Sequence, residues 1–190
     1  VIWKLGLYGG HNIDSLDASK FALIYNKENG EYVASEGAYR SRAAEMPGYV
    51  MGYSAPLFSP TGGVKISALD LAKYMMMHMN YGEYNGVRII SQESSKLMQT
   101  PVRVTGDPAA AEYALCLTEF KDYIEDEKYN VPGNYLIGHT GGAYGLNSIM
   151  IWSPADNWGI VAMTNGFTSV KDKSFLKSIT RAVYNSCIKE

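Results

Sequence analysis

The spacing of apolar and polar residues changes along the chain and divides it into three stretches. Residues 1–58 are polar, rich in glycine and aromatic side chains, and show no sustained period, which predicts a loop-rich region. A short strand is expected at residues 21–25, and Asn29-Gly30 predicts a hairpin turn. Because so long a stretch with little regular structure is uncommon in an independent domain, we expect it to lean on neighbouring structure.

Helical spacing begins after a rigid turn at residues 56–63, and residues 59–100 form a small helical region. Ser67 is a suitable N-cap. Asp70, three positions later, can accept a hydrogen bond from the free amides at the start of the helix, as the second residue of a capping box does. The apolar residues that follow at helical spacing are Ala68, Leu71, Ala72, Met75, Met76 and Met79. This helix is expected to end near residues 80–82, and a second one should begin after Ser91 and stop before Pro101.

From residue 113 to 190 the period changes to two, which predicts a sheet. Strands are expected at residues 113–118, 135–139, 146–152 and 158–164, with a hairpin turn at 154–157. The charged segment 121–130 is interpreted as a solvated hairpin tip or insertion. A final helix at residues 170–188 carries an apolar stripe of Phe175, Leu176, Ile179, Ala182, Val183 and Cys187.

These elements predict an α+β fold of the α/β-sandwich type: an antiparallel sheet with a C-terminal helix packed on it and a smaller helical region. With 190 residues, 46% of them hydrophobic, residues 1–190 suit one domain. A formal net charge of −2 indicates no nucleic-acid partner, and no apolar run is long enough for a transmembrane segment.

Cysteine and histidine are too sparse to suggest a disulfide framework or a metal centre. Cys116 and Cys187 lie far apart and are interpreted as buried thiols. The histidines, His11, His78 and His139, are scattered without ligand spacing. No metal or other cofactor is therefore expected.

The most informative stretch for chemistry runs from Gly138 to Leu146 and includes His139-Thr140-Gly141-Gly142. A glycine amide at a strand edge can donate to a developing oxyanion, and His and Thr side chains can bind a substrate carboxylate. The spacing alone also fits a tight turn without chemistry. No Gly-Lys-Ser/Thr follows, so it is not a phosphate loop.

Residues 138–166 resemble the third-motif region of the serine β-lactamase and penicillin-binding protein family, where a Lys-Thr-Gly or His-Thr-Gly strand precedes two more strands and a helix. Upstream, Ser59-Pro60-Thr61-Gly62-Gly63 and the helix after Ser67 are similar to that family's Pro-x-Gly-Gly turn and helix, in the same order. The resemblance implies a partial β-lactamase/transpeptidase-like fold. It further implies a serine hydrolase that acts through an acyl-enzyme, as do class C β-lactamases, DD-peptidases and esterases.

The resemblance also implies roles for the matching positions. His139 would bind the substrate carboxylate, Thr140 would hydrogen-bond the substrate, Gly141 would permit close approach, and Gly142 would supply one oxyanion-hole amide. Tyr144 would be a further substrate-binding residue. The implied substrate is a small molecule or peptide (a β-lactam, a D-Ala peptide or an ester), and His at position 139 favours the esterase, peptidase and D-amino-acid-hydrolase branches. Relatives that are exported bacterial proteins suggest a periplasmic or extracellular location.

The family's first two motifs are missing from their expected places. Ser-x-x-Lys, which holds the nucleophile, does not occur before the His-Thr-Gly stretch, and neither Tyr-x-Asn nor Ser-x-Asn occurs at all. Ser174-x-x-Lys177 follows that stretch on the final helix, where we expect both side chains to face solvent. The chain is thus expected to be the C-terminal portion of a longer hydrolase, inactive alone and completed by a missing N-terminal part of the same protein.

Two other functions remain open from the sequence. One is a catalytically inactive, penicillin-binding-like module that binds peptide or glycan. The other is a structural domain whose tyrosine-rich surface packs on a partner protein.

Overall fold

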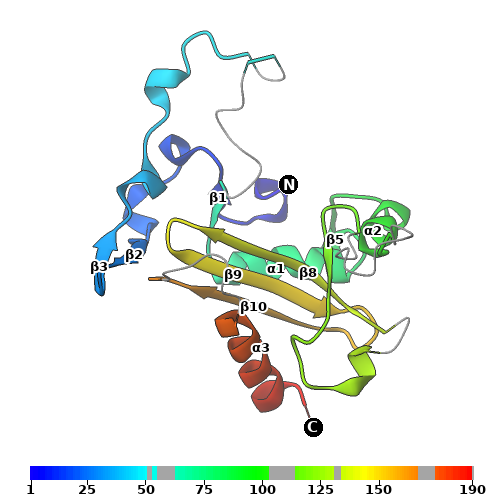
Figure 1. The fold of residues 1–190 in the computed structure, drawn as a ribbon. Helices are drawn as coiled ribbons and strands as arrows, with labels where there is room; N and C mark the ends of the chain where they lie inside the picture. The colour runs from blue at the N-terminus through cyan, green and yellow to red at the C-terminus, as the bar shows by residue number, and fades with distance from the viewer. Residues whose placement is uncertain (51–52, 55–62, 103–113, 131–133, 167–173, 190) are drawn as a thin grey trace.

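The sheet at the centre of the molecule has four antiparallel strands in the order β10-β9-β8-β7 (Figure 1). The computed structural model describes residues 1–50, 53–54, 63–102, 114–130, 134–166 and 174–189. The strands are β7 (Thr118–Phe120), β8 (Leu136–Ala143), β9 (Leu146–Ser153) and β10 (Trp158–Thr164). The strands expected at 135–139, 146–152 and 158–164 are therefore confirmed, and β8 extends farther than expected.

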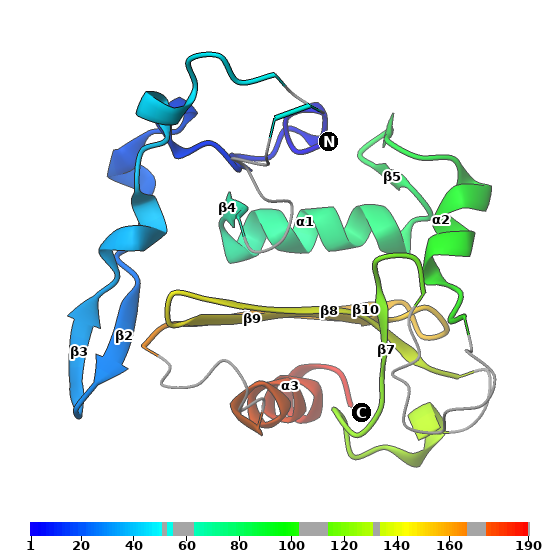
Figure 2. The same ribbon diagram turned by 45° about the horizontal axis from the view of Figure 1, so that its top comes forward.

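Two helices cover opposite faces of this sheet, as Figure 2 shows: α1 (Ala68–Met79) on one and α3 (Ser174–Cys187) on the other. Successive residues of a strand point to opposite faces, so each strand contributes to two cores. On the α1 face the core contains Met75, Ile137, Met150 and Trp152. On the α3 face it contains Leu136, Ile149, Ile151, Ile160, Leu176 and Tyr184. This layering is the α+β sandwich that the sequence predicts.

The helical region begins where the sequence places it. The Ser67 hydroxyl accepts a hydrogen bond of 3.0 Å from the Asp70 amide, as expected of an N-cap. The Asp70 carboxylate, however, does not complete a capping box; it accepts from the Tyr8 amide at 3.1 Å and pairs with Lys73 at 2.7 Å. The second helix, α2 (Gln92–Gln99), has Ser91 as its N-cap. Among the described residues, no helix is long and apolar enough to cross a bilayer.

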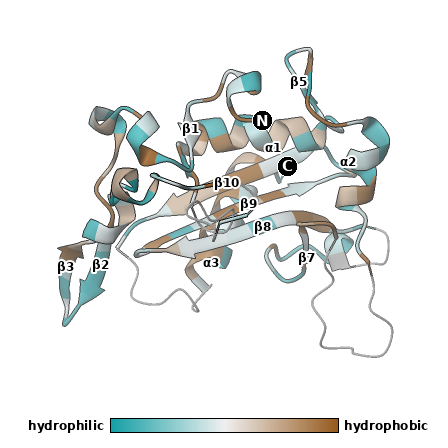
Figure 3. Cartoon of the chain, turned by 90° about the horizontal axis from the view of Figure 1, so that it is seen from above, coloured by the Kyte–Doolittle hydropathy of each residue, from teal (hydrophilic) through white to brown (hydrophobic). Residues whose placement is uncertain are grey.

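The remaining strands form three small ladders: β1 (Gly9–Gly10) with β4 (Lys65–Ile66), β2 (Tyr25–Glu28) with β3 (Glu31–Ala34), and β5 (Glu83–Tyr84) with β6 (Val87–Arg88). The β2–β3 hairpin is largely hydrophilic (Figure 3). Short 3-10 helices η1 to η6 lie at Trp3–Leu5, Ile13–Ser15, Ala18–Lys20, Glu36–Tyr39, Ala43–Glu45 and Glu127–Asn130.

Several expectations about local structure are corrected. The Asn29-Gly30 turn is present, with φ of 51° and 90°, but the strand before it begins at Tyr25, so the strand expected at 21–25 is wrong. Residues 114–117 form a turn instead of a strand, because the Ala114 amide donates to the Leu117 carbonyl at 2.9 Å. The turn expected at 56–63 lies almost wholly outside the described residues, as do residues 113 and 170–173.

The charged segment 121–130 and the last helix also pack differently from the prediction. Tyr123, Ile124 and Tyr129 are buried with α3 in one core, so this segment is not a solvated tip. The buried face of α3 is Leu176, Thr180 and Tyr184, whereas most of the predicted stripe, including Phe175, Val183 and Cys187, is exposed. Cys116 is exposed as well, so neither thiol is buried as expected.

Candidate active-site edge of the sheet

The candidate site lies on β8, at the part of its edge that β7 leaves open. β9 pairs with β8 from Ile137 to Ala143, whereas β7 pairs only with residues 136–138 on the other side. In the portion of the chain that the structure describes, the edge from His139 to Ala143 therefore has no partner strand. An open edge presents backbone N–H and C=O groups to any extended ligand.

The hairpin between β8 and β9 determines which backbone groups point outward. Ala143 pairs with Leu146, so the loop consists of Tyr144 and Gly145 alone, with φ of 57° and 89°. Positive φ at both positions is the type I′ turn, whose closing pair is hydrogen-bonded. Because hydrogen-bonded and non-hydrogen-bonded pairs alternate, the pair Gly142 and Asn147 is non-hydrogen-bonded. The N–H of Gly142 thus points away from β9, toward the open edge.

His139 and Thr140 flank this edge on different faces of the sheet. His139 is exposed and belongs to the α1 face with Ile137, whereas Thr140 is half-buried and belongs to the α3 face with Ile149. The His139 Nδ1 lies 2.5 Å from the Thr140 carbonyl oxygen. Because a carbonyl only accepts, this nitrogen must carry the proton, which leaves Nε2 directed elsewhere. Neither residue is enclosed in a packed core.

The far end of the site is fixed by the N-terminal stretch. A Cβ on Gly145 would lie 2.7 Å from the Asn26 amide oxygen, so β2 packs directly against the β8–β9 turn. Asn165, just after β10, accepts from the Tyr25 amide at 2.8 Å and donates to the Leu23 carbonyl at 2.7 Å. Residues 1–58 were expected to lean on neighbouring structure, and the described part of this stretch does so here and through the pairing of β1 with β4.

Lys65 is a neighbour of the site that the sequence analysis missed. It lies in β4, donates to the Gly63 carbonyl at 3.2 Å, and places its Nζ 6.0 Å from the centroid of the Tyr144 ring. Burial lowers the pKa of its ammonium group. A lysine before an N-cap carries no local signal of this contact, because the contact joins segments that are distant in the sequence.

The Ser-x-x-Lys pattern of α3 is remote from this edge. Ser174 is exposed as expected, but Lys177 is half-buried and lies 5.3 Å from the centroid of the Tyr123 ring. The same spacing recurs at Ser186 and Lys189, both exposed near the end of α3. Helix α3 covers the face opposite to that of His139 (Figure 2). The described residues contain no group of three His, Cys, Asp or Glu side chains arranged to hold a metal ion.

The fold and this edge define an α+β protein with part of a β-lactamase/transpeptidase-like fold. The sequence model of a family described as Beta-lactamase matches residues 12–183, and the chain belongs to this family. No curated protein matches the chain.

Solved structures similar to the chain have the same fold at low identity. A penicillin binding protein from Bacillus halodurans is 17% identical with a TM-score of 0.60, and the match covers 94% of this chain and 47% of that one. A D-stereospecific amidohydrolase from Streptomyces sp. is 15% identical (TM-score 0.59; 100% and 47% covered). A class C beta-lactamase is 16% identical (TM-score 0.62; 100% and 50% covered). The chain spans about half the length of these proteins.

Proposed function

We propose that this chain is the C-terminal part of a serine hydrolase related to β-lactamases, D-Ala-D-Ala carboxypeptidases and esterases. In this proposal β8 forms one wall of the acylation pocket. The nucleophile motif Ser-x-x-Lys belongs to a missing N-terminal part of the same protein, and this chain alone is inactive. The observation that carries the proposal is the amide of Gly142, which points to an open sheet edge beside an exposed His139.

The chemistry follows from the order of groups along β8. A substrate that lies extended along the edge would place its scissile carbonyl at Gly142, whose N–H is one of two oxyanion donors. Thr140 and His139 precede Gly142 along β8, where they would bind a carboxylate on the leaving-group side of the substrate. Gly141 has no side chain to obstruct the ligand, and a Cβ there would lie 2.8 Å from Ser148 Oγ. The substrate class is a β-lactam, a D-Ala peptide or an ester.

The first test uses the chain alone. Incubation with a fluorescent penicillin and with a chromogenic ester, followed by intact-mass measurement, should reveal no covalent adduct. Stoichiometric acylation would contradict the proposal that the nucleophile lies outside this chain.

The second test uses the longer protein, which should be acylated at a serine upstream of residue 1. In that protein Gly142→Pro removes the oxyanion N–H and should slow acylation by about 10²–10³-fold, whereas Gly142→Ala retains the N–H and serves as its control. Ser174→Ala should leave the rate unchanged. A longer protein that binds D-Ala peptide or glycan without acylation would favour the inactive binding module instead.

A further inference from the structure

The backbone of Lys65 is held in place by the pairing of β4 with β1 and by the start of α1. β4 pairs with β1, where Gly10 lies opposite Lys65 and Gly9 opposite Ile66. A Cβ on Gly9 would lie 3.3 Å from the Ile66 Cβ and closer still to the Lys65 carbonyl, so glycine is required for this close pairing. Ser67 then caps α1 two residues later. The backbone of Lys65 is therefore a rigid support for its side chain.

The charge of Lys65 has no acidic counterpart in the described part of the chain. Three other lysines pair with carboxylates: Lys73 with Asp70 at 2.7 Å, Lys128 with Asp156 at 3.6 Å and Lys121 with Glu119 at 3.8 Å. Among the described residues, the half-buried Lys65 side chain contacts the Gly63 carbonyl and the Tyr144 ring. A ligand anion beside the Lys65 Nζ would supply the charge partner that this ammonium group lacks among the described residues.

Tyr144 occupies a backbone position that disfavours tyrosine. The first residue of a type I′ turn has positive φ, for which Asn, Asp and Gly are preferred, so a tyrosine at this position is strained. Its ring packs against Gly37, whose added Cβ would lie 3.6 Å from the ring, and 46% of the residue remains exposed. The exposed part of the aromatic ring at this strained position is available for contact with a ligand.

The order of residues on β8 gives the position of this contact. His139 and Thr140 precede Gly142, and Tyr144 follows it by two residues, or roughly 7 Å at the rise of a strand. A substrate with its leaving-group carboxylate at His139 and Thr140 and its carbonyl at Gly142 directs its acyl portion toward Tyr144. We propose that Lys65 and Tyr144 bind an anionic group on the acyl portion of the substrate. This inference rests on the proposed function of the β8 edge.

The test compares two ligands that differ only in this group: N-glutaryl-D-alanine, whose acyl chain ends in a carboxylate, and N-valeryl-D-alanine, whose acyl chain ends in a methyl. Both are titrated to millimolar concentration against the ¹⁵N-labelled chain, and the amide signals of Gly141 and Gly142 report binding. We expect the glutaryl compound to bind about tenfold more tightly, which corresponds to about 1.4 kcal/mol. Lys65→Met should reduce the ratio of the two affinities to about one while leaving the valeryl affinity unchanged.

Lys177→Met is the matched control, because Lys177 is also half-buried and its Nζ lies 5.3 Å from the centroid of the Tyr123 ring, on the face of the sheet opposite to that of His139. It should preserve the affinity ratio. Equal binding of both ligands by the unmodified chain, or an unchanged ratio in Lys65→Met, would overturn the role of Lys65 and leave the proposed β8 edge intact. If neither ligand shifted the amides of Gly141 and Gly142, the proposed edge would fail, and this inference with it.

Discussion

At the scale of single residues, Gly138 sets how closely β8 approaches β9 just before the candidate site. It lies opposite Ile151 on β9 and Thr118 on β7. A Cβ at this position would lie 2.8 Å from the Ile151 Cα and even closer to the Met150 carbonyl oxygen. These are backbone atoms that cannot move without separating the strands. The glycine before His139 is therefore required for packing, independently of any chemistry.

Gly138→Ala should lower the free energy of unfolding by about 3 kcal/mol, since overpacking a closed strand interface forces the backbone apart. Urea unfolding followed by circular dichroism measures the change. Gly10→Ala is the control, because a Cβ on that strand glycine would meet only Leu16, at 3.8 Å, and stability should change little. Equal losses in both variants would show that Gly138 is not closely packed.

The residues of the β8 edge could be found from the sequence because they form a continuous local motif. His139, Thr140, Gly141 and Gly142 lie in one strand, although the strand expected from the sequence ended at His139. Lys65 could not be found, since its contact with Tyr144 depends on how β4 and the β8–β9 turn meet in space. The opposite faces of His139 and Thr140 follow from simple alternation once the strand is known to continue to Ala143.

At the scale of elements, predictions succeeded where local patterns and turn residues agreed. Helix α1 has an N-cap at Ser67, and the β9–β10 hairpin has its turn at residues 154–157. The prediction failed for residues 121–130, where charge suggested solvent. There, Asp126 and Asp156 accept hydrogen bonds from buried tyrosines, which places a charged segment against the core. Such pairing depends on tertiary contacts and leaves no periodic signal.

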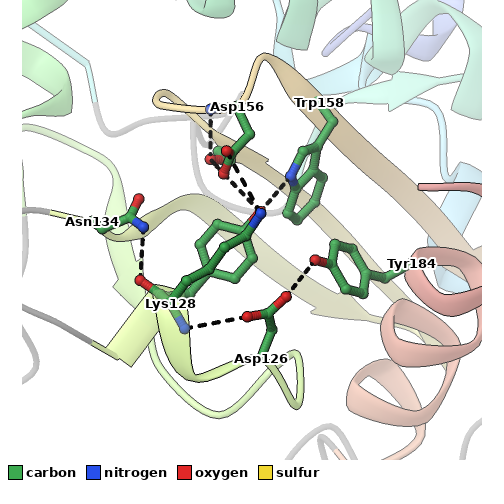
Figure 4. A network of polar contacts seen from close by, with 8 residues as sticks. Asp126, Lys128, Asn134, Asp156, Trp158 and Tyr184 are labelled. Carbon is green, nitrogen blue, oxygen red and sulfur yellow. Dashed lines mark hydrogen bonds and ion pairs between the residues drawn. The ribbon is translucent and has the colours of Figure 1, made fainter. Parts of the chain in front are cut away.

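A polar network fastens this segment between α3 and the sheet (Figure 4). The Tyr184 hydroxyl donates to Asp126 at 2.7 Å, the Tyr129 hydroxyl donates to Asp156 at 2.7 Å, and the Trp158 indole donates to the Tyr129 hydroxyl at 2.7 Å. The bond from Tyr184 holds the pKa of Asp126 below its usual value, while burial and the same carboxylate raise the pKa of Tyr184. The network explains why α3 buries Tyr184 and not its exposed apolar stripe.

Tyr184→Phe should destabilise the chain by roughly 1.5–3 kcal/mol, because it removes a partly buried hydrogen bond to a charged group. Amide hydrogen exchange should also accelerate at Tyr123 and Tyr129, since their segment loses its attachment to α3. Tyr53→Phe, at a tyrosine that is 90% exposed, controls for loss of a hydroxyl and should have no effect. If both variants unfolded at the same urea concentration, the network would not fasten the segment.

At the scale of the whole molecule, one buried polar group connects both helices of the α1 side with the sheet. Gln99 of α2 donates to the His78 carbonyl of α1 at 2.8 Å and accepts from the Trp152 indole of β9 at 3.1 Å. The Tyr135 hydroxyl, just before β8, donates to the Gln99 carbonyl at 3.2 Å. His78 is itself 2% exposed, between the rings of Tyr74 and Trp152. A change at this junction therefore acts on the support of the entire candidate site.

The charge state of His78 makes this junction sensitive to acid. Burial lowers the pKa of His78 from 6.5 to about 4, so the folded chain binds its proton less readily than the unfolded chain does. The contribution of neutral His78 to the free energy of unfolding is fully present above pH 6.5 and is lost as the pH falls toward 4. Because a tenfold difference in proton affinity corresponds to about 1.4 kcal/mol, the loss should total about 3 kcal/mol. Lowered pKa values are also found for three carboxylates, Asp70, Asp126 and Asp156. The stability that these carboxylates contribute to the folded chain is lost only at more acidic pH.

Urea unfolding at intervals between pH 7 and 4 should therefore show stability decreasing over this window in the unmodified chain. His78→Phe retains a ring between Tyr74 and Trp152 but cannot titrate, so its stability should stay nearly constant over the same range, whatever its absolute value. His139→Gln removes an exposed histidine and should keep the slope of the unmodified chain. If the free energy of unfolding of His78→Phe still decreased with falling pH, other groups would be responsible for the acid sensitivity. The junction of α1, α2 and the sheet would then not be its cause.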